Sequence, residues 1–202
     1  MLILALIALI TGILCGTWNS DNIIISAISL HKNLILYILM FSVGISIGRH
    51  HELIRKIKEY HIKIFIIPTG VILGSLIGGI ICSFITGYSV YDGAAVSSGL
   101  GWYSLAGITI ENLSGVQLGS IAFLSNLMRE LFSFFSIPII SKRLNYYCCI
   151  AAAGATSEDT TLPMMIKYTN EETVIFSVLN GVICSAFVPI LISLCYSFPI
   201  DI

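Results

Sequence analysis

The apolar run from Val116 to Ile140 most constrains how this chain can fold. At about 1.5 Å of rise per residue, a helix of this length crosses the hydrocarbon core of a bilayer. Arg129 and Glu130 lie side by side near its middle. A charge at the centre of a spanning helix costs about 2.5–3.5 kcal/mol on insertion scales. Because folding does not require that cost, the pair indicates a transport path first and a structural ion pair second.

The composition indicates a chain whose solvent is lipid. Of its 202 residues, 56% are hydrophobic and 10% are charged, and the mean hydropathy is +0.95. In a soluble domain about a quarter of the residues are charged. The length leaves room for about five or six spanning elements and for little outside the bilayer. We therefore expect an all-α polytopic membrane protein.

Five apolar runs predict spanning helices within a single integral membrane domain, residues 1–202. The domain is expected to hold, in order, two N-terminal spans within 1–48, a basic loop at 49–63, a span with a first broken segment at 64–112, a span with a second broken segment at 116–167 and a last span at 174–196. The positive-inside rule places the basic loop in the cytoplasm. The alternative, a nucleic-acid patch, would need a soluble domain to present it, so no nucleic-acid partner is expected.

Two moderately apolar segments, Tyr91–Ile110 and Tyr146–Ile166, do not fit plain spanning helices. Both are rich in small residues and hydroxyls where a spanning helix carries Leu and Phe. Broken backbone at membrane depth survives only where it is buried in protein or lines a water-filled cavity. Transporters build binding sites from such elements. Each segment is expected to be a re-entrant hairpin or a discontinuous helix.

The basic residues favour two re-entrant segments over two further spans. With the loop 49–63 inside the cell, the N-terminus lies inside and residues 64–86 carry the chain outside. If the first segment returns to the outer side, residues 116–140 cross inward and place Lys142 and Arg143 inside. A second segment entering from the inside then leaves the C-terminus outside. If both segments spanned instead, Lys142 and Arg143 would lie outside.

This order contains an internal repeat, because a span followed by a small-residue break occurs at 64–110 and again at 116–166. The two units are inverted relative to each other, as in many secondary transporters, whose sites lie near the midplane where the breaks meet. Gly-x-x-x-Gly spacing, which lets helices approach closely in lipid, occurs at Gly12/Gly16, Gly44/Gly48 and Gly74/Gly78. If the first two spans use this spacing to pack against a second copy of the chain, the protein would be a homodimer.

The polar residues of the 116–140 run form two stripes on a helix. Asn126, Glu130 and Ser133 follow i, i+4, i+7 spacing, and Ser125 and Arg129 lie on a neighbouring stripe. Adjacent residues diverge by about 100°, so Arg129 and Glu130 are each expected to meet a partner from another element. Glu130 would carry a proton or pair with a cationic substrate, and Arg129 would hold a carboxylate. The alternative is a static ion pair between helices.

The second broken segment carries two adjacent acids, Glu158 and Asp159, flanked by hydroxyls that include Thr156 and Ser157. The stretch Thr161–Pro163 is typical of a helix start, where N–H groups would suit a substrate carboxylate. Asp159, ahead of Glu158, would suit an ammonium group or a coupling proton. The alternative is a solvated loop between helices.

In the first broken segment, Trp102, Tyr103 and Ser104 follow a glycine. The aromatic pair would either stack on a substrate or belong to the interfacial belt. No His lies in any spanning run, so Ser/His catalysis within the membrane has no base. No cysteine and histidine pattern has metal-site spacing. Neither an enzyme nor a cofactor is expected.

Three stretches resemble the signatures of the LysO-type lysine exporter family: Ser98–Gly107, Phe123–Glu130 and Gly154–Pro163. The motifs Gly-Trp-Tyr-Ser-Leu and Gly-Ala-Thr-Ser-x-Asp are fairly specific, and their order and approximate spacing also match. The resemblance implies an inner-membrane secondary transporter that exports L-lysine, with protons as the exchanged ion. It also implies that intramembrane acids matter, and Glu130 and Asp159 match those motifs here.

Full-length members of that family are longer, so the resemblance covers their C-terminal portion. Three forms stay open: a chain active alone, a homodimer, and one half of a split exporter whose separate small membrane partner supplies N-terminal helices. Lysine presents a carboxylate, suited to Arg129, and ammonium groups, suited to Glu130 or Asp159. Burial favours the protonated form of a carboxyl group, which would allow exchange of proton for ammonium. The alternatives are a transporter of small carboxylates and a non-transporting membrane subunit.

Overall fold

The structure is a computed structural model that describes residues 63–197 and, before them, residue 7, residues 10–15 and residues 31, 34, 38, 41 and 45. The chain divides into two compact units, Met1–Arg49 and His50–Ile202. In the first unit residues 10–15 are helical, and Thr11 Oγ1 donates a hydrogen bond of 2.8 Å to Ile7 O. The remainder of the two predicted N-terminal spans and of the basic loop lies outside the described residues.

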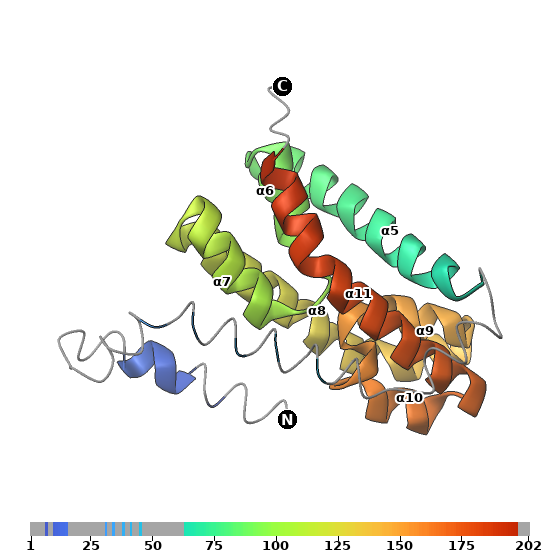
Figure 1. Ribbon diagram of the computed structural model, residues 1–202. Coiled ribbons are helices and arrows are strands. Elements are labelled where there is room, and N and C mark those ends of the chain that lie inside the picture. The colour runs from blue at the N-terminus through green and yellow to red at the C-terminus, as the bar shows by residue number, and fades with distance from the viewer. Residues whose placement is uncertain are drawn as a thin grey trace. The chain divides into compact units, whose positions relative to one another are not determined.

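The second unit is helical in all its regular elements between residues 63 and 197 (Figure 1). These elements are α5 (Lys63–Thr86), α6 (Val90–Ser97), α7 (Tyr103–Ser114), α8 (Val116–Arg143), α9 (Tyr146–Ala153), the 3-10 helix η1 (Gly154–Glu158), α10 (Leu162–Tyr168) and α11 (Glu171–Ser197).

Three of these helices, α5, α8 and α11, are long and apolar enough to cross a bilayer. They coincide with the runs 64–86, 116–140 and 174–196, so these predicted spans are confirmed as helices of spanning length. The ends differ by a few residues. α8 continues to Arg143, and α11 begins at Glu171, because charged residues at a helix end remain helical where they can reach the aqueous boundary.

Both segments that were expected to be broken are interrupted helices. The first consists of α6 and α7 separated by residues 98–102, where Leu100 has φ 51° and Gly101 has φ 102°. The second consists of α9, η1 and α10, with Gly154 at φ 65°. Glycine adopts positive φ without steric cost, whereas Leu100, which is fully buried, does so only because its surroundings hold it there.

Each interrupted segment starts and finishes at the same end of the second unit. At one end, Gln117 Nε2 at the start of α8 donates to Tyr88 OH before α6 (3.3 Å), and Tyr196 OH near the end of α11 donates to Asp92 Oδ1 (3.2 Å). At the other end, residues from α8, α9 and α10 form a buried cluster against the start of α11. In Figure 1 the interruptions lie between these two ends. The chain thus turns back at each interruption.

The close contact between α5 and α6 is made at Gly79, not at the predicted glycines Gly74 and Gly78. A Cβ atom on Gly79 would collide with Gly93 O and with Ser97 of α6, so these backbones touch. Within the described part of the chain, nothing lies within 4 Å of a Cβ on Gly74 or Gly78. The prediction of close packing through Gly74 and Gly78 is therefore not met there. The contact is made by the next glycine along the helix.

Candidate functional site

The two interruptions are in direct contact. Ala155 N in η1 donates a hydrogen bond of 2.9 Å to Leu100 O between α6 and α7. A Cβ atom on Gly154 would collide with that same carbonyl and would lie 2.9 Å from Arg129 Nη2 of α8. Only glycine therefore fits where the second interruption crosses the first, and α8 passes beside the crossing. The predicted meeting of the two breaks is confirmed.

On one side of α8 four side chains form a group that we call the acid cluster: Glu130, Asp159, Thr160 and Tyr103. The Thr160 hydroxyl donates to Asp159 Oδ1 at 3.2 Å and also interacts with the Glu130 carboxylate. Asp159 lies close enough to Glu130 for their charges to interact. The Tyr103 side chain lies within electrostatic range of both carboxylates. Sequence reasoning named both acids, and the structure brings them together.

Within the acid cluster, Glu130 is the buried member. This residue is 2% exposed, and among the described residues its Oε2 atom has no hydrogen-bond partner. Asp159, by contrast, is exposed, and its Oδ1 also accepts a hydrogen bond from Thr160 N. A buried carboxylate oxygen without a partner is rare, because an unpaired charge away from water is costly. A proton or a cation can satisfy such an oxygen.

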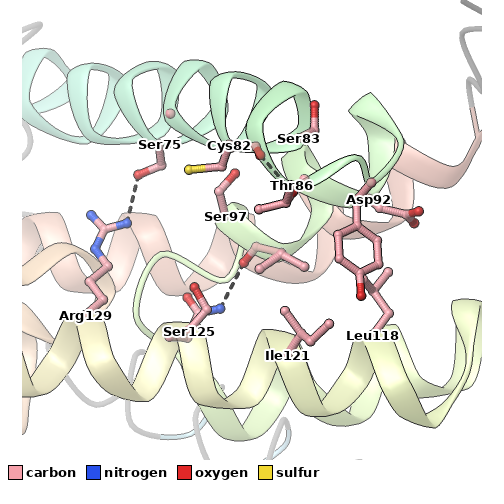
Figure 2. A pocket seen from close by; sticks show the side chains of 16 residues that line it. Ser75, Cys82, Ser83, Thr86, Asp92, Ser97, Leu118, Ile121, Ser125 and Arg129 are labelled. Atoms are coloured by element: carbon pink, nitrogen blue, oxygen red, sulfur yellow. Dashed lines mark hydrogen bonds between the residues drawn. The ribbon is translucent and has the colours of Figure 1, made fainter.

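Arg129 turns away from the acid cluster into a separate cavity. Its Nη1 donates to Ser75 Oγ on α5 at 2.8 Å, and its Nη2 contacts Ala151 O at 3.5 Å. Figure 2 shows the Arg129 side chain reaching from α8 toward Ser75. The expected divergence of Arg129 and Glu130 is thus confirmed. The alternative was a static ion pair between helices, and within residues 63–197 no salt bridge joins Arg129 or Glu130 to another helix.

The cavity beside Arg129, which we call the arginine cavity, has a volume of about 390 Å³ and lies between α5, α6 and α8. That volume is within the roughly 300–1,000 Å³ range of small-molecule pockets. Hydroxyl groups from all three helices line it, together with Asp92 and the apolar Leu118 and Ile121, which are labelled in Figure 2. These hydroxyl residues are Ser75, Ser83, Thr86, Ser97 and Ser125.

Asn126 holds the first interruption in place. Its Oδ1 accepts from Gly101 N at 2.8 Å, and its Nδ2 donates to Val96 O and Ala122 O, each at 2.9 Å. The residue is 3% exposed. These three bonds use both ends of the Asn126 amide and connect α8 to the broken backbone. That Asn126 binds substrate stays a prediction.

Asn180 of α11 does the same for the second interruption, and sequence reasoning missed it. Its Nδ2 donates to Gly154 O at 2.9 Å and to Ser157 Oγ at 3.0 Å. The signal was present, because an asparagine in the apolar run 174–196 carries the same kind of cost that drew attention to Glu130.

The hydroxyls of the second interruption also bond to the protein. Ser157 Oγ donates to Ser177 O at 2.8 Å, and Ser177 Oγ returns a bond of 2.7 Å to Ser157 O. Thr156 Oγ1 donates to Ala153 O at 3.0 Å. These contacts stabilise the interruption, and a role of Thr156 and Ser157 in binding substrate stays a prediction.

The start of α10 differs from the expected carboxylate site. Pro163 lies in the first turn, as predicted. However, Thr161 N donates to Thr156 O at 3.1 Å, and Leu162 N donates to Asp159 O at 3.3 Å. Proline has no N–H. The first N–H groups of α10 are therefore used within the interruption, and the expectation that they bind a carboxylate is not supported.

Glu158 points to α11, away from Asp159. Its Oε1 accepts a hydrogen bond of 2.9 Å from Ser185, and a Cβ on Gly181 would lie 2.9 Å from Glu158 Cγ. Gly181 therefore makes room for this acid. The preference for Asp159 over Glu158 as the member of the site agrees with this placement.

The three candidates in the first interruption differ in position. Tyr103 belongs to the acid cluster and packs edge-to-face on Phe123 of α8, with ring centroids 5.2 Å apart. Trp102 precedes α7 and Ser104 lies in its first turn, both half-buried. Among the described residues, no three His, Cys, Asp or Glu side chains could share a metal ion.

Comparison with known proteins identifies the family. The family model described as "Lysine exporter LysO" matches residues 6–196. A Haemophilus influenzae protein named "Putative lysine exporter" is 33% identical over 201 residues, which cover 96% of each chain. The "Lysine exporter LysO" of Escherichia coli is 35% identical over 158 residues, which cover 78% of this chain and 52% of that protein. No solved structure matches the chain. The chain belongs to the lysine exporter LysO family.

Proposed function

We propose that this chain exports L-lysine across the inner membrane in exchange for protons. The observation that carries the proposal is the buried Glu130 Oε2 atom, which lies near the exposed Asp159 and has no hydrogen-bond partner within residues 63–197. The names of the two relatives supply the substrate. A lysine ammonium group or a proton can each satisfy a carboxylate.

Exchange follows if the two occupants exclude each other. Burial favours the neutral, protonated form of Glu130 when the site holds no cation. An arriving ammonium group stabilises the charged form and displaces the proton. Asp159, which is exposed and shares Thr160 with Glu130, would receive the cation or proton first. Glu130 would then hold it within the protein.

The proposal includes a topology. We infer two re-entrant segments that enter from opposite sides of the membrane and form an inverted repeat, with the N-terminus inside and the C-terminus outside. The return of each interrupted segment to its starting end and the bond between Ala155 and Leu100 support this arrangement. In such transporters, substrate sites lie where the two breaks meet.

Lysine efflux from exporter-null cells tests the function. Glu130→Gln keeps the size of the side chain but removes the group that exchanges a proton, so we expect export to fall at least tenfold. In inside-out vesicles that contain a pH gradient, added lysine should dissipate the gradient with the unsubstituted protein and not with Glu130→Gln. Asp159→Asn should reduce both signals.

Glu172→Gln is the matched control, because Glu172 is an exposed acid in the first turn of α11, away from the acid cluster. Lysine export by Glu130→Gln at the level of Glu172→Gln would remove the proposed mechanism. No lysine-dependent flux with the unsubstituted purified chain in liposomes would favour a subunit that needs a partner. The assay can be repeated at a lower ratio of protein to lipid and after cross-linking. A flux per chain that falls on dilution and is preserved by cross-linking would indicate a homodimer, and a constant flux per chain would indicate a monomer.

A further inference from the structure

We infer that the arginine cavity binds the carboxylate end of the transported amino acid, about 100° around α8 from the acid cluster. This inference rests on the proposed function and deepens it. It assigns a second recognition site, with Ser75 as the residue that positions Arg129. The acid cluster would read positive charge, and the arginine cavity would distinguish an amino acid from a simple diamine.

The first argument is the incomplete set of partners around Arg129. A guanidinium carries five N–H donors in a fixed fork. Two contacts are present, a bond of 2.8 Å to Ser75 Oγ and a marginal contact of 3.5 Å to Ala151 O. Among the described residues, no carboxylate forms an ion pair with Arg129. The cation therefore has neutral neighbours and open donors.

The second argument is cost. Arg129 lies near the middle of α8, a helix of spanning length. A guanidinium in such a place is expensive unless a counter-charge or water compensates it. Carboxylate is the anion that matches the guanidinium fork, with two parallel hydrogen bonds. A transported carboxylate would supply the missing charge in the loaded state.

The third argument is the shape and lining of the cavity. Arg129 lies at its wall together with Ser75 of α5, Ser97 of α6 and Ser125 of α8. Ser97 donates to Ala94 O at 2.9 Å, and its oxygen can still accept. Hydroxyls of this kind suit an α-amino group or a carboxylate oxygen beside the guanidinium. At about 390 Å³ the space is adequate for one amino acid.

The fourth argument is the link to the crossing of the two interruptions. The Arg129 guanidinium packs against the position where Gly154 would carry a Cβ. A substrate carboxylate in the cavity would therefore bind the same guanidinium that contacts the crossing of the two interruptions. A substrate bound there can be sensed by the backbone that carries Asp159, five residues after Gly154.

A competition experiment tests the inference. Inside-out vesicles containing the full chain take up labelled L-lysine, and unlabelled L-lysine or 1,5-diaminopentane competes. The diamine equals lysine without its carboxylate. Loss of charge-assisted hydrogen bonds to a buried guanidinium weakens binding by at least about tenfold. We therefore expect the diamine to compete at least tenfold more weakly than lysine.

Variants locate that preference in the arginine cavity. Ser75→Ala removes the positioning bond and should lower the preference for lysine several-fold, with little change in inhibition by the diamine. Ser125→Trp should fill the cavity and lower lysine affinity at least tenfold. Ser120→Ala and Ser120→Trp are the controls, because Ser120 lies exposed on α8 outside the cavity and bonds its own helix at Val116 O.

The outcomes separate this inference from the proposed function. Lysine uptake with equal inhibition by lysine and diamine would overturn the carboxylate site and leave export intact. Ser75→Ala and Ser125→Trp that match their Ser120 controls would do the same. No lysine uptake by the unsubstituted protein would instead contradict the proposed function. Arg129→Lys keeps the positive charge but lacks the forked donors of the guanidinium. Its preference for lysine over the diamine should fall to about that of Ser75→Ala.

Discussion

At the scale of single residues, two asparagines form hydrogen bonds with backbone groups that the helix interruptions leave without helical partners. Asn126 satisfies Gly101 N and Val96 O, and Asn180 satisfies Gly154 O and Ser157 Oγ. In a helix these backbone groups would bond to their own chain. In a membrane no water is present to replace the missing partners. A side-chain amide from the following long helix, which offers both donors and an acceptor, therefore makes each interruption tolerable.

Asn126→Ala tests this role. The change leaves Gly101 N and Val96 O buried without a partner, at about 1–3 kcal/mol for each group. We expect the unfolding temperature of the purified protein in detergent to fall markedly. Asn170→Ala is the control, since Asn170 caps α11 in an exposed position and a lost cap costs about 0.5–2 kcal/mol. An unchanged unfolding temperature combined with weaker lysine binding would instead return Asn126 to the substrate site.

Residue types and their helix face could be read from the sequence, but partners could not. The spacing of Asn126, Glu130 and Ser133 predicted one stripe, and all three are at most 3% exposed. The partners of Asn126 come from backbone up to 30 residues earlier in the chain. That pairing depends on how the helices pack. The sequence also predicted that Arg129 and Glu130 diverge on the helix, but it could not name Ser75 as the partner of Arg129.

At the scale of elements, α5, α8 and α11 were predictable because the length of an apolar run sets the length of a spanning helix. The interruptions were predictable because small and hydroxyl residues replaced Leu and Phe. The point at which each backbone turns was not, because Leu100 takes a positive φ that its residue type does not favour. Contacts between the two interruptions decide it.

The crossing of the interruptions makes a specific prediction for Gly154. Alanine at positive φ costs about 1–2 kcal/mol, and its Cβ would also collide with Leu100 O and approach Arg129. Gly154→Ala should therefore reduce both the unfolding temperature and lysine export. Gly87→Ala shares the positive φ of 76°, but nothing within the described residues lies within 4 Å of its Cβ. If the two variants lose equal stability, backbone strain alone matters and the crossing contributes nothing.

At the scale of the whole molecule, α8 directs its two adjacent charged side chains to different surroundings. Arg129 and Glu130 are adjacent in sequence, yet one faces the arginine cavity and the other faces the acid cluster. The two side chains diverge by about 100° around the helix. Under the proposed function, the carboxylate and the ammonium group of one solute would each meet one of these two charges. The contact of Arg129 with Gly154 ties both to the same backbone crossing.

The topology of the second unit yields the last prediction. Residues 88 and 115 flank the first interrupted segment, and residues 145 and 170 flank the second; all four are exposed. If each segment returns to its own side, a membrane-impermeant maleimide should label Tyr88→Cys and Gly115→Cys from outside the cell, in a background without the native cysteines. Asn145→Cys and Asn170→Cys should be labelled only in inside-out vesicles.

The sidedness follows from Lys142 and Arg143 at the end of α8, which favour the cytoplasm. Same-side labelling within each pair is the test of re-entry, since a segment that spans would place the two members of its pair on opposite sides. Lysine export by each cysteine variant confirms that the labelled protein is folded. Opposite labelling of residues 88 and 115 would make α6 and α7 one spanning element and would place residues 145 and 170 on altered sides. The acid cluster would then no longer lie between two segments that approach it from opposite faces of the membrane.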